Sequence, residues 1–364
     1  MALKIGIVGL PNVGKSCLFN AITNATVSSE NFPFCTIEPN SGIVAIPDSR
    51  LKVLSDISGS KKLLEATIEF VDIAGLVKGA SKGEGLGNQF LSNIRESSAI
   101  AHVVRCFEDD NIIHVYDRVD PIDDIEIINS ELLLSDLDMV QKLVSSLQKK
   151  IKAKQEDDIK CLAIFTKFEE SLSNSIPLRK VELTEDQQDL IKGYHFLTSK
   201  KVVYIANVSE DNLGKPNDLV TKVQEYAKQS GDEVFVISVK LEEEVSALDA
   251  ADQLEFLSQY GLNESGLGRL AKSCFKLLGL QTYLTTGEKE TRAWTIPAEC
   301  TAPQAAGVIH TDFEKGFIRA NVVSYDDYVT CNGMVGAREK GLLRQEGKEY
   351  KMADGDVVEF LFNN

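Results

Sequence analysis

The chain has 364 residues, of which 43% are hydrophobic and 26% are charged, and its formal net charge is −16. This length exceeds one ordinary core, so two or three domains are expected. No apolar run approaches the roughly 18 residues of a membrane span, and the start runs into a predicted strand without a signal peptide. The negative charge argues against a general polyanion binder. We therefore expect a cytoplasmic globular protein with no membrane or DNA partner.

Seven cysteines are scattered along the chain and form no C-x-x-C pair. Their odd number and irregular spacing indicate neither a disulfide framework nor a zinc site. We expect reduced thiols. Redox control through Cys35, which adjoins Thr36, is an open alternative.

The most informative segment, Gly9-Leu10-Pro11-Asn12-Val13-Gly14-Lys15-Ser16, matches G-x-x-x-x-G-K-[ST] at every fixed position. It lies between a buried strand predicted at residues 3–8 and a helix predicted at residues 16–22. Such a turn directs backbone N–H groups and a helix N-terminus at an anion. Lys15 can reach the β- and γ-phosphates, and the Ser16 hydroxyl can ligate Mg²⁺. The segment therefore predicts binding of a nucleoside triphosphate.

Two further segments extend the predicted phosphate and metal site. A second apolar strand, residues 67–71, leads into Asp72-Ile73-Ala74-Gly75, the D-x-x-G pattern of switch-type NTPases. Asp72 is expected to hold Mg²⁺ through water, and the Gly75 N–H to face the γ-phosphate. Thr36 is the candidate second hydroxyl for Mg²⁺. The glycine-rich residues 75–87 are costly to order, so γ-phosphate contacts are expected to switch them.

The residue that usually orients the attacking water is missing. Leu76 follows D-x-x-G where many GTPases carry Gln, and an aliphatic side chain neither donates nor accepts a hydrogen bond. His114 is the candidate replacement once the adjoining loop closes, with a structural histidine as the alternative. Lys15 and His114 are therefore the candidate catalytic residues, and intrinsic turnover is expected to be slow.

The base-reading element is expected after a later strand, residues 202–206. That strand ends in Asn207-Val208-Ser209-Glu210 instead of Asn-Lys-x-Asp. In the GTPase pattern the Asp accepts hydrogen bonds from guanine N1–H and the exocyclic amine, and the Lys stem packs on the base. Val208 and the longer Glu210 match that geometry poorly, which favours ATP. Ser238 follows a further predicted strand, residues 234–237, where the last base-contacting loop of such folds lies.

Two segments lie outside this doubly wound α/β sheet. A 4-3 spacing of apolar residues predicts one coiled-coil helix, and residues 157–172 supply its antiparallel partner, with a helical hairpin packed on the core as the alternative. The spaced residues are Leu133, Leu137, Val140, Val144, Leu147 and Ile151. From residue 281 short strands and one helix are typical of a small α+β module. We predict a nucleotide domain at 1–129 and 199–279, a helical arm at 130–198 and a terminal module at 280–364.

Taken together, these motifs resemble the YchF/Ola family of Obg-related P-loop NTPases, of the TRAFAC class, over essentially the whole chain. The supporting segments are residues 9–16, 31–36, 72–87 and 207–210, and the terminal residues 292–296 and 310–319. The resemblance implies a coiled-coil insert, a C-terminal TGS domain of the β-grasp type and a preference for ATP over GTP. It also implies association with the ribosome, where the large subunit and ribosomal RNA are candidate contacts.

The resemblance also implies roles for individual residues. The phosphates would be cradled by Asn12, Val13, Gly14, Lys15, Ser16 and Cys17. Mg²⁺ would be held by Ser16 and Thr36, and Val208 would contact the base. Asn12 is similar to the position that binds K⁺ in some related NTPases, so K⁺ is a second candidate cation. Two basic clusters are candidate RNA contacts or solvated faces: Lys149, Lys150, Lys152 and Lys154, and Arg338, Lys340, Arg344, Lys348 and Lys351.

These expectations describe a slow ribosome-associated ATPase that cycles between two conformations and acts on translation. Water would attack the γ-phosphate in line, with Lys15, Mg²⁺ and backbone N–H groups stabilising the charge. Two alternatives stay open. One is a GTP-specific Obg-type GTPase, and the other is an ATP-gated binding adaptor in which hydrolysis is incidental.

Overall fold

The computed structural model describes residues 4–25, 40–73, 86–116, 118–150 and 156–363. Its contacts divide the chain into two units: unit 1 is Met1–Asn24, Glu38–Gly42 and Glu69–Gly261, and unit 2 is Ala25–Ile37, Ile43–Ile68 and Leu262–Asn364. Within the described stretches, no helix combines the length and apolar composition that a bilayer crossing requires.

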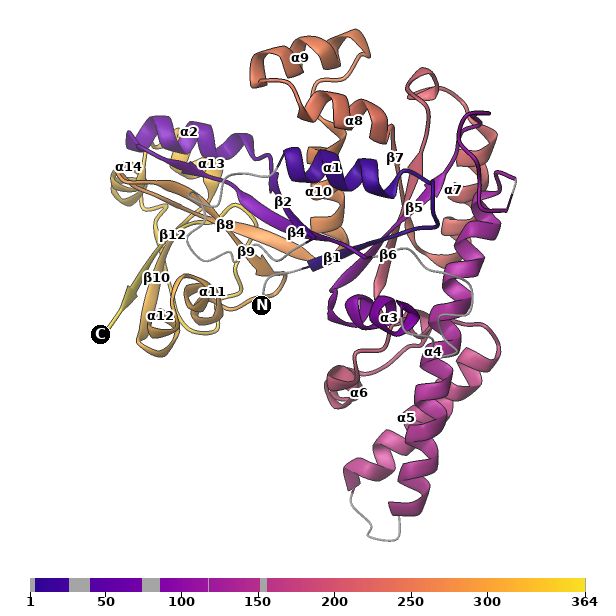
Figure 1. Cartoon of the computed structure of the whole chain (residues 1–364). Coiled ribbons are helices and arrows are strands. Elements are labelled where there is room, and N and C mark those ends of the chain that lie inside the picture. Colours follow the sequence, from indigo (N-terminus) through magenta and orange to yellow (C-terminus); the bar gives the residue numbers. More distant parts are fainter. Residues whose placement is uncertain (1–3, 26–39, 74–85, 117, 151–155, 364) are drawn as a thin grey trace. The chain divides into compact units, whose positions relative to one another are not determined.

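The first sheet has strand order β2-β4-β1-β5-β6-β7, and β1, β5, β6 and β7 lie wholly in unit 1 (Figure 1). The neighbours from β4 to β7 all pair in parallel. Every residue of β5 is buried, as expected for a parallel strand covered on both faces. The strands are β1 (Lys4–Val8), β2 (Ser41–Ile46), β4 (Ala66–Asp72), β5 (Ala99–Arg105), β6 (Lys201–Asn207) and β7 (Glu233–Ile237).

Helices cover both faces of this sheet, which confirms the predicted doubly wound α/β arrangement. α1 packs with α8 on one face, whereas α3 and α4 lie on the other, with α7 against α4 (Figure 1). The helices of unit 1 are α1 (Lys15–Asn24), α3 (Leu86–Glu96), α4 (Pro121–Lys150), α5 (Glu156–Ser173), α6 (Glu185–Ile191), α7 (Asp218–Ser230), α8 (Val239–Ser246) and α9 (Ala250–Gln259).

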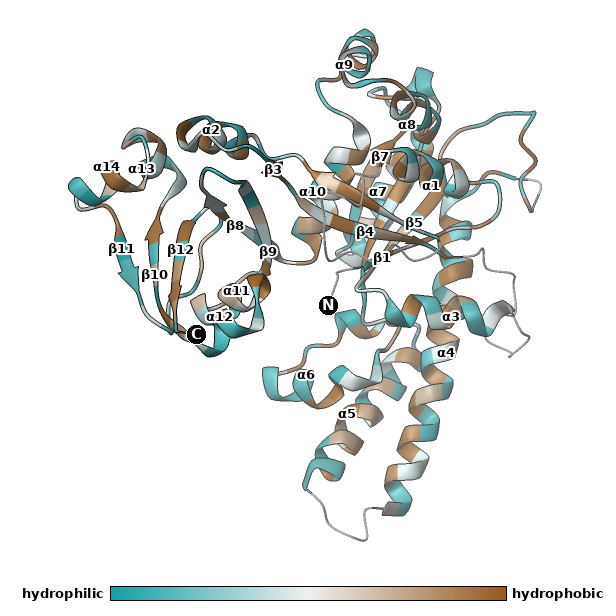
Figure 2. Cartoon of the chain, turned by 60° about the vertical axis from the view of Figure 1, so that its left-hand side comes forward, coloured by the Kyte–Doolittle hydropathy of each residue, from teal (hydrophilic) through white to brown (hydrophobic). Residues whose placement is uncertain are grey.

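The long helix α4 and the helix α5 form the predicted antiparallel arm (Figure 1). Their shared apolar core contains most of the spaced residues from the sequence pattern, namely Val140, Val144 and Leu147 as buried members and Leu133 and Leu137 as partly buried ones. Ile151 lies outside the described residues. α5 contributes Cys161, Ile164, Phe165, Phe168 and Leu172 to the same core. Both helices carry hydrophobic and hydrophilic residues, as expected for helices with one buried face (Figure 2).

The second sheet, in unit 2, has strand order β11-β10-β12-β8-β9-β3 (Figure 2). The neighbouring strands β8 and β12 are parallel, whereas β8 with β9 and β10 with β12 are antiparallel. α11 contacts β9 and β10. This is the β-grasp arrangement expected of the terminal module. The strands are β3 (Leu63–Leu64), β8 (Leu280–Thr286), β9 (Thr291–Pro297), β10 (Phe317–Val323), β11 (Arg344–Glu346) and β12 (Val357–Phe362).

The domain boundaries predicted at residues 129, 198 and 279 stay a prediction, and the contact-based units divide the chain differently. They join residues 43–68 and 262–279 to the terminal module. The reason is packing, because α2 contacts β8 and β9 and α10 contacts β8. The helices of unit 2 are α2 (Ser49–Ser58), α10 (Gly266–Leu277), α11 (Ala302–Ile309), α12 (Thr311–Lys315), α13 (Tyr325–Thr330) and α14 (Met334–Glu339).

Candidate functional site

The turn between β1 and α1 is shaped by two residues with positive φ, Asn12 at 63° and Gly14 at 102°. A Cβ atom on Gly14 would lie 2.4 Å from Asn207 Nδ2, and one on Gly9 would lie 2.8 Å from the Val103 carbonyl oxygen. Neither position has room for a larger residue. Packing beneath the loop therefore requires both fixed glycines of the motif. The loop leads directly into the N-terminus of α1, where backbone N–H groups favour an anion.

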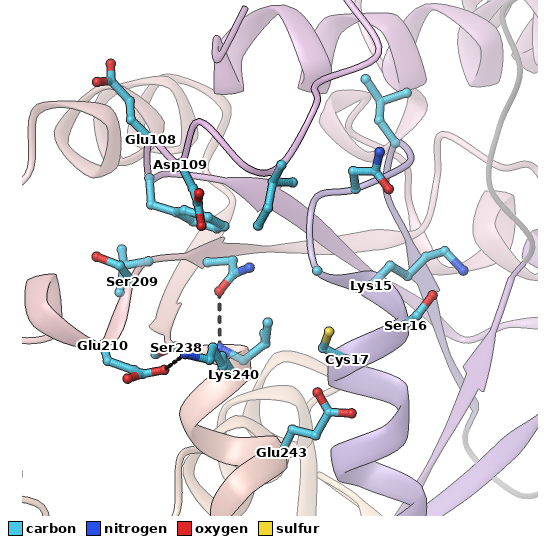
Figure 3. Close-up of a pocket in the computed structure, with 18 of the residues that line it drawn as sticks. Lys15, Ser16, Cys17, Glu108, Asp109, Ser209, Glu210, Ser238, Lys240 and Glu243 are labelled. Carbon is cyan, nitrogen blue, oxygen red and sulfur yellow. Dashed lines mark hydrogen bonds and ion pairs between the residues drawn. The ribbon is translucent and has the colours of Figure 1, made fainter.

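A cavity of about 610 Å³ lies beside this turn (Figure 3). A volume of this size is typical of a small-molecule site. Its wall comes from the turn and the start of α1, the loop after β5, the loop after β6, and the start of α8. Of the predicted site residues, the lining includes Asn12, Gly14, Lys15, Ser16, Cys17, Asn207, Val208, Glu210 and Ser238. Val13 is fully buried instead, and Thr36 and Gly75 lie outside the described residues.

Asn207, the last residue of β6, ties three segments of the site together. Its Nδ2 donates to the Val13 carbonyl oxygen at 2.9 Å, and its Oδ1 accepts from the Val239 amide at 3.1 Å. Its backbone carbonyl accepts from the Cys106 amide at 2.8 Å. The residue is 2% exposed. Asn207 therefore positions the phosphate-binding turn against α8, and its predicted contact with the base stays a prediction.

The opposite side of the cavity from Lys15 carries the predicted base-reading residues (Figure 3). Val208 is buried, and Lys240 Nζ lies 2.9 Å from Glu210 Oε1. Ser238 is 1% exposed, and its hydroxyl has no hydrogen-bond partner in the described part of the chain. Because a buried hydroxyl without a partner is costly, a ligand in the cavity is a natural partner for Ser238.

At the phosphate side, Lys15 Nζ lies 2.5 Å from Asp72 Oδ1, and both side chains are largely shielded from solvent. Among the described residues, no group of three or more His, Cys, Asp or Glu side chains could hold a metal alone. Mg²⁺ does not require such a cage, since it is usually held by one or two protein oxygens together with phosphates and water. The Ser16 hydroxyl and the Asp72 carboxylate are hard oxygen donors of this kind, so the residues present fit Mg²⁺.

His114 does not line the cavity and is buried. Its Nε2 lies 3.0 Å from Asp124 Oδ2 in the first turn of α4, and its Nδ1 accepts from the Tyr116 amide at 3.3 Å. These bonds assign the proton to Nε2. Burial raises the pKa of the Asp124 carboxyl, and the hydrogen bond from His114 opposes that rise. In this conformation His114 is a structural side chain, as the alternative in the sequence analysis expected, and its catalytic role stays a prediction.

The loop after β5 is a part of the site that the sequence analysis missed. Buried Arg105 donates to the carbonyl oxygens of Phe107, Asp109 and Ile112 at 3.0, 3.1 and 2.9 Å. The loop then meets the phosphate-binding turn, because Asn12 Nδ2 donates to the Ile113 carbonyl oxygen at 3.0 Å. The sequence signal was an arginine that ends a strand whose one other polar residue is His102. An arginine at that position has to satisfy its donors inside the protein.

Cys17 lines the cavity one residue after the motif and faces an acidic neighbour. Burial raises the pKa of its thiol, and the charge of Glu243 and a hydrogen bond to it raise that pKa further. Glu243 also accepts from Asn20 Nδ2 at 2.9 Å. Cys17 is therefore a protonated thiol that lines the site and lacks the character of a reactive cysteine.

Known proteins that are similar to this chain bind nucleotides according to their descriptions, in agreement with the phosphate-binding turn. A family model described as 50S ribosome-binding GTPase matches residues 4–167, and one described as a protein of unknown function (DUF933) matches residues 280–363. The Ribosome-binding ATPase YchF of Bacillus subtilis (strain 168) is 53% identical over 365 residues, and that of Escherichia coli O157:H7 is 53% identical over 363 residues; each comparison covers all of both chains.

A solved structure agrees as well. The Schizosaccharomyces pombe YchF GTPase has a TM-score of 0.87 and is 38% identical, and the match covers 99% of this chain and 97% of that one. At this identity and coverage the likeness extends through the nucleotide cavity, the helical arm and the terminal β-grasp module. The chain therefore belongs to the YchF family of P-loop NTPases.

Proposed function

We propose that this protein is a ribosome-associated ATPase that uses nucleotide binding and hydrolysis as a switch in translation or the stress response. The observation that carries the proposal is the cavity itself, in which a complete phosphate-binding turn faces a base side that lacks the guanine-reading Lys and Asp. The printed names of the relatives, Ribosome-binding ATPase YchF, support both the nucleotide and the partner.

In the proposed reaction water attacks the γ-phosphate and displaces ADP. Lys15 would leave Asp72 to neutralise charge on the phosphates, and the backbone N–H groups of the turn would bind the same oxygens. Ser16, Asp72 and Thr36 would hold Mg²⁺, which supplies further charge neutralisation. No Gln follows the D-x-x-G motif, so turnover without a partner is expected to be slow.

The preference for ATP is tested by competition. A fluorescent ATP analogue is displaced by ATP and by GTP at fixed Mg²⁺, and the two dissociation constants are compared. The poor match of Val208 and Glu210 to a guanine site supports tighter binding of ATP. Tighter binding of GTP would overturn the preference and leave the GTPase alternative.

One observation favours a second function, an ATP-gated adaptor in which hydrolysis is incidental. The candidate catalytic residue His114 has both ring nitrogens bonded within the protein. The test compares Lys15→Ala, which should lose nucleotide binding, with His114→Ala, which should keep it. ATP affinity, hydrolysis and ATP-dependent co-sedimentation with ribosomes are measured for each. A variant that binds ATP, does not hydrolyse it and keeps full ATP-dependent co-sedimentation with ribosomes supports the adaptor.

The ribosomal contact is proposed to involve the large subunit and ribosomal RNA, and a cytoplasmic location follows from that partner. All five residues of the terminal basic cluster are exposed. Arg344 lies 3.3 Å from Glu346 and Lys351 pairs with Glu299, whereas Arg338, Lys340 and Lys348 make no ion pair with the described residues. These three lysine and arginine side chains are the best candidates for phosphate contacts. Their replacement should weaken co-sedimentation and reduce its salt dependence.

K⁺ is proposed as a second cation near Asn12. The decisive experiment measures ATP hydrolysis with and without ribosomes, in Na⁺ and in K⁺. Stimulation by ribosomes is expected, and its absence would count against the translation assignment. Equal rates in both salts would remove K⁺ from the site.

A further inference from the structure

The base side of the cavity holds one ion pair that crosses between two segments. Glu210 begins a short 3-10 turn (Glu210–Asn212) after β6, and Lys240 lies in the first turn of α8 after β7. Lys240 Nζ is 2.9 Å from Glu210 Oε1, and both residues line the cavity (Figure 3). The carboxylate of Glu210 raises the pKa of Lys240, so the ammonium is charged at neutral pH.

Glu210 occupies the position that reads the base in a guanine site. It is the fourth residue of Asn207–Glu210, where a guanine-reading site has an Asp that accepts from N1–H and from the 2-amino group. Two donors on guanine require a carboxylate with both oxygens available. Here Oε1 is paired with Lys240 and is itself buried, and the Glu210 side chain as a whole is 24% exposed.

The hydrogen-bonding groups of Lys240 also disfavour guanine. An ammonium has three donors and no acceptor. Guanine presents N1–H and the 2-amino group, so it would meet the ammonium donor to donor, whereas adenine has an acceptor at N1. A mismatch of hydrogen-bonding groups discriminates more strongly than a change of shape.

We infer that Lys240 is a specificity-determining residue, which holds the Glu210 carboxylate in an ion pair and thereby denies it to guanine. The inference deepens the proposed function and rests on it, because it names the group that sets the preference for ATP. Lys240 is a positioning residue for Glu210 in this role. The absence of the Asp and Lys of a guanine-reading site would then explain only part of the preference for ATP.

The expected effect is moderate, because the Lys240 side chain is 72% exposed and water screens the pair. Removal of the ammonium should lower the ratio of the GTP and ATP dissociation constants by about three- to five-fold. The change should come mainly from tighter binding of GTP. ITP has N1–H but no 2-amino group, so it should gain less than GTP.

The experiment measures displacement of a fluorescent ATP analogue by ATP, GTP and ITP for four variants of the full chain. Lys240→Met removes the ion pair, Lys240→Arg keeps it, and Glu210→Gln removes the carboxylate. Lys222→Met replaces an exposed lysine of α7 that does not line the cavity, and serves as the matched control. The Lys240→Met substitution is also made in the Glu210→Gln background, where only the donor-to-donor contact with guanine remains, and its effect on the ratio should there be smaller, below about two-fold.

The result that supports the inference is a lowered ratio for Lys240→Met alone, with Lys240→Arg and Lys222→Met close to the wild type. An unchanged ratio, or an equal change in the Glu210→Gln background, overturns it. Failure of the proposed function would show in the wild-type ratio, whereas failure of this inference shows in the change between variants. Salt provides a test without any substitution: the wild-type ratio should fall as ionic strength rises, and a constant ratio would contradict the ion pair as its cause.

Discussion

Replacement of Asn207 by alanine should disable the nucleotide site and destabilise the fold around it. The substitution leaves the Val13 carbonyl and the Val239 amide without their bonds of 2.9 and 3.1 Å. Each buried polar group left unsatisfied costs about 1–3 kcal/mol. Water from the adjoining cavity can satisfy part of this loss. We therefore expect the free energy of unfolding to fall by about 2–4 kcal/mol in total.

The same change should weaken ATP binding, because Gly14 and the turn before it are packed on the Asn207 side chain. A looser turn presents its N–H groups less accurately to the phosphates, and a loss of about 1.4 kcal/mol in binding corresponds to ten-fold in affinity. Urea unfolding followed by circular dichroism gives the stability, and displacement of a fluorescent ATP analogue gives the affinity. The affinity is measured without urea, where all variants are folded.

Asn212→Ala is the matched control, since Asn212 is an exposed asparagine in the same segment. It should change stability by less than about 0.5 kcal/mol. The reasoning is refuted if Asn207→Ala behaves like this control in both assays. A variant that loses ATP affinity but keeps its stability would show instead that Asn207 contacts the base and has no positioning role.

Three other substitutions test separate features. Gly14→Ala should lower ATP affinity by at least about ten-fold, because the added Cβ would lie 2.4 Å from Asn207 Nδ2 and the φ of Gly14 is 102°. Unchanged ATP binding would contradict the packing argument. Burial lowers the pKa of His102 from 6.5 to about 3, so the unfolded state takes up a proton first and stability falls as the pH drops below 6.5. By pH 5 the loss should be about 2 kcal/mol, and His102→Phe should flatten this part of the urea stability profile; a slope equal to that of the wild type would refute it. His114→Ala should lower the free energy of unfolding by about 1–3 kcal/mol because Asp124 loses its partner, and an unaltered urea midpoint would speak against a structural His114.

Local sequence patterns predicted much of the fold. The phosphate-binding turn, the arm and four strands of the terminal module, β8, β9, β10 and β12, follow from short-range spacing of glycines and apolar residues, and the structure places them as predicted. The prediction of one helix in this module was wrong, because its described residues form four, α11 to α14. The helix α2 and the strand β11 were not predicted. α2 has a weakly amphipathic sequence that is capped by Asp48 and Gly59, and β11 is three residues long with an exposed pattern. Such elements are decided by tertiary contacts more than by their own periodicity.

The two sides of the cavity differ in how far sequence alone could describe them, and the reason is contact distance along the chain. The phosphate side is one contiguous octapeptide, so its chemistry is visible in the motif. The base side depends on Asn207, whose amide bonds a carbonyl 194 positions away, and on an ion pair between residues 210 and 240. A single sequence shows that the usual base-reading residues are absent, but it does not show which new partners the remaining polar groups take. The proposed role of Lys240 in the choice of base depends on this long-range pairing, which only the folded structure shows.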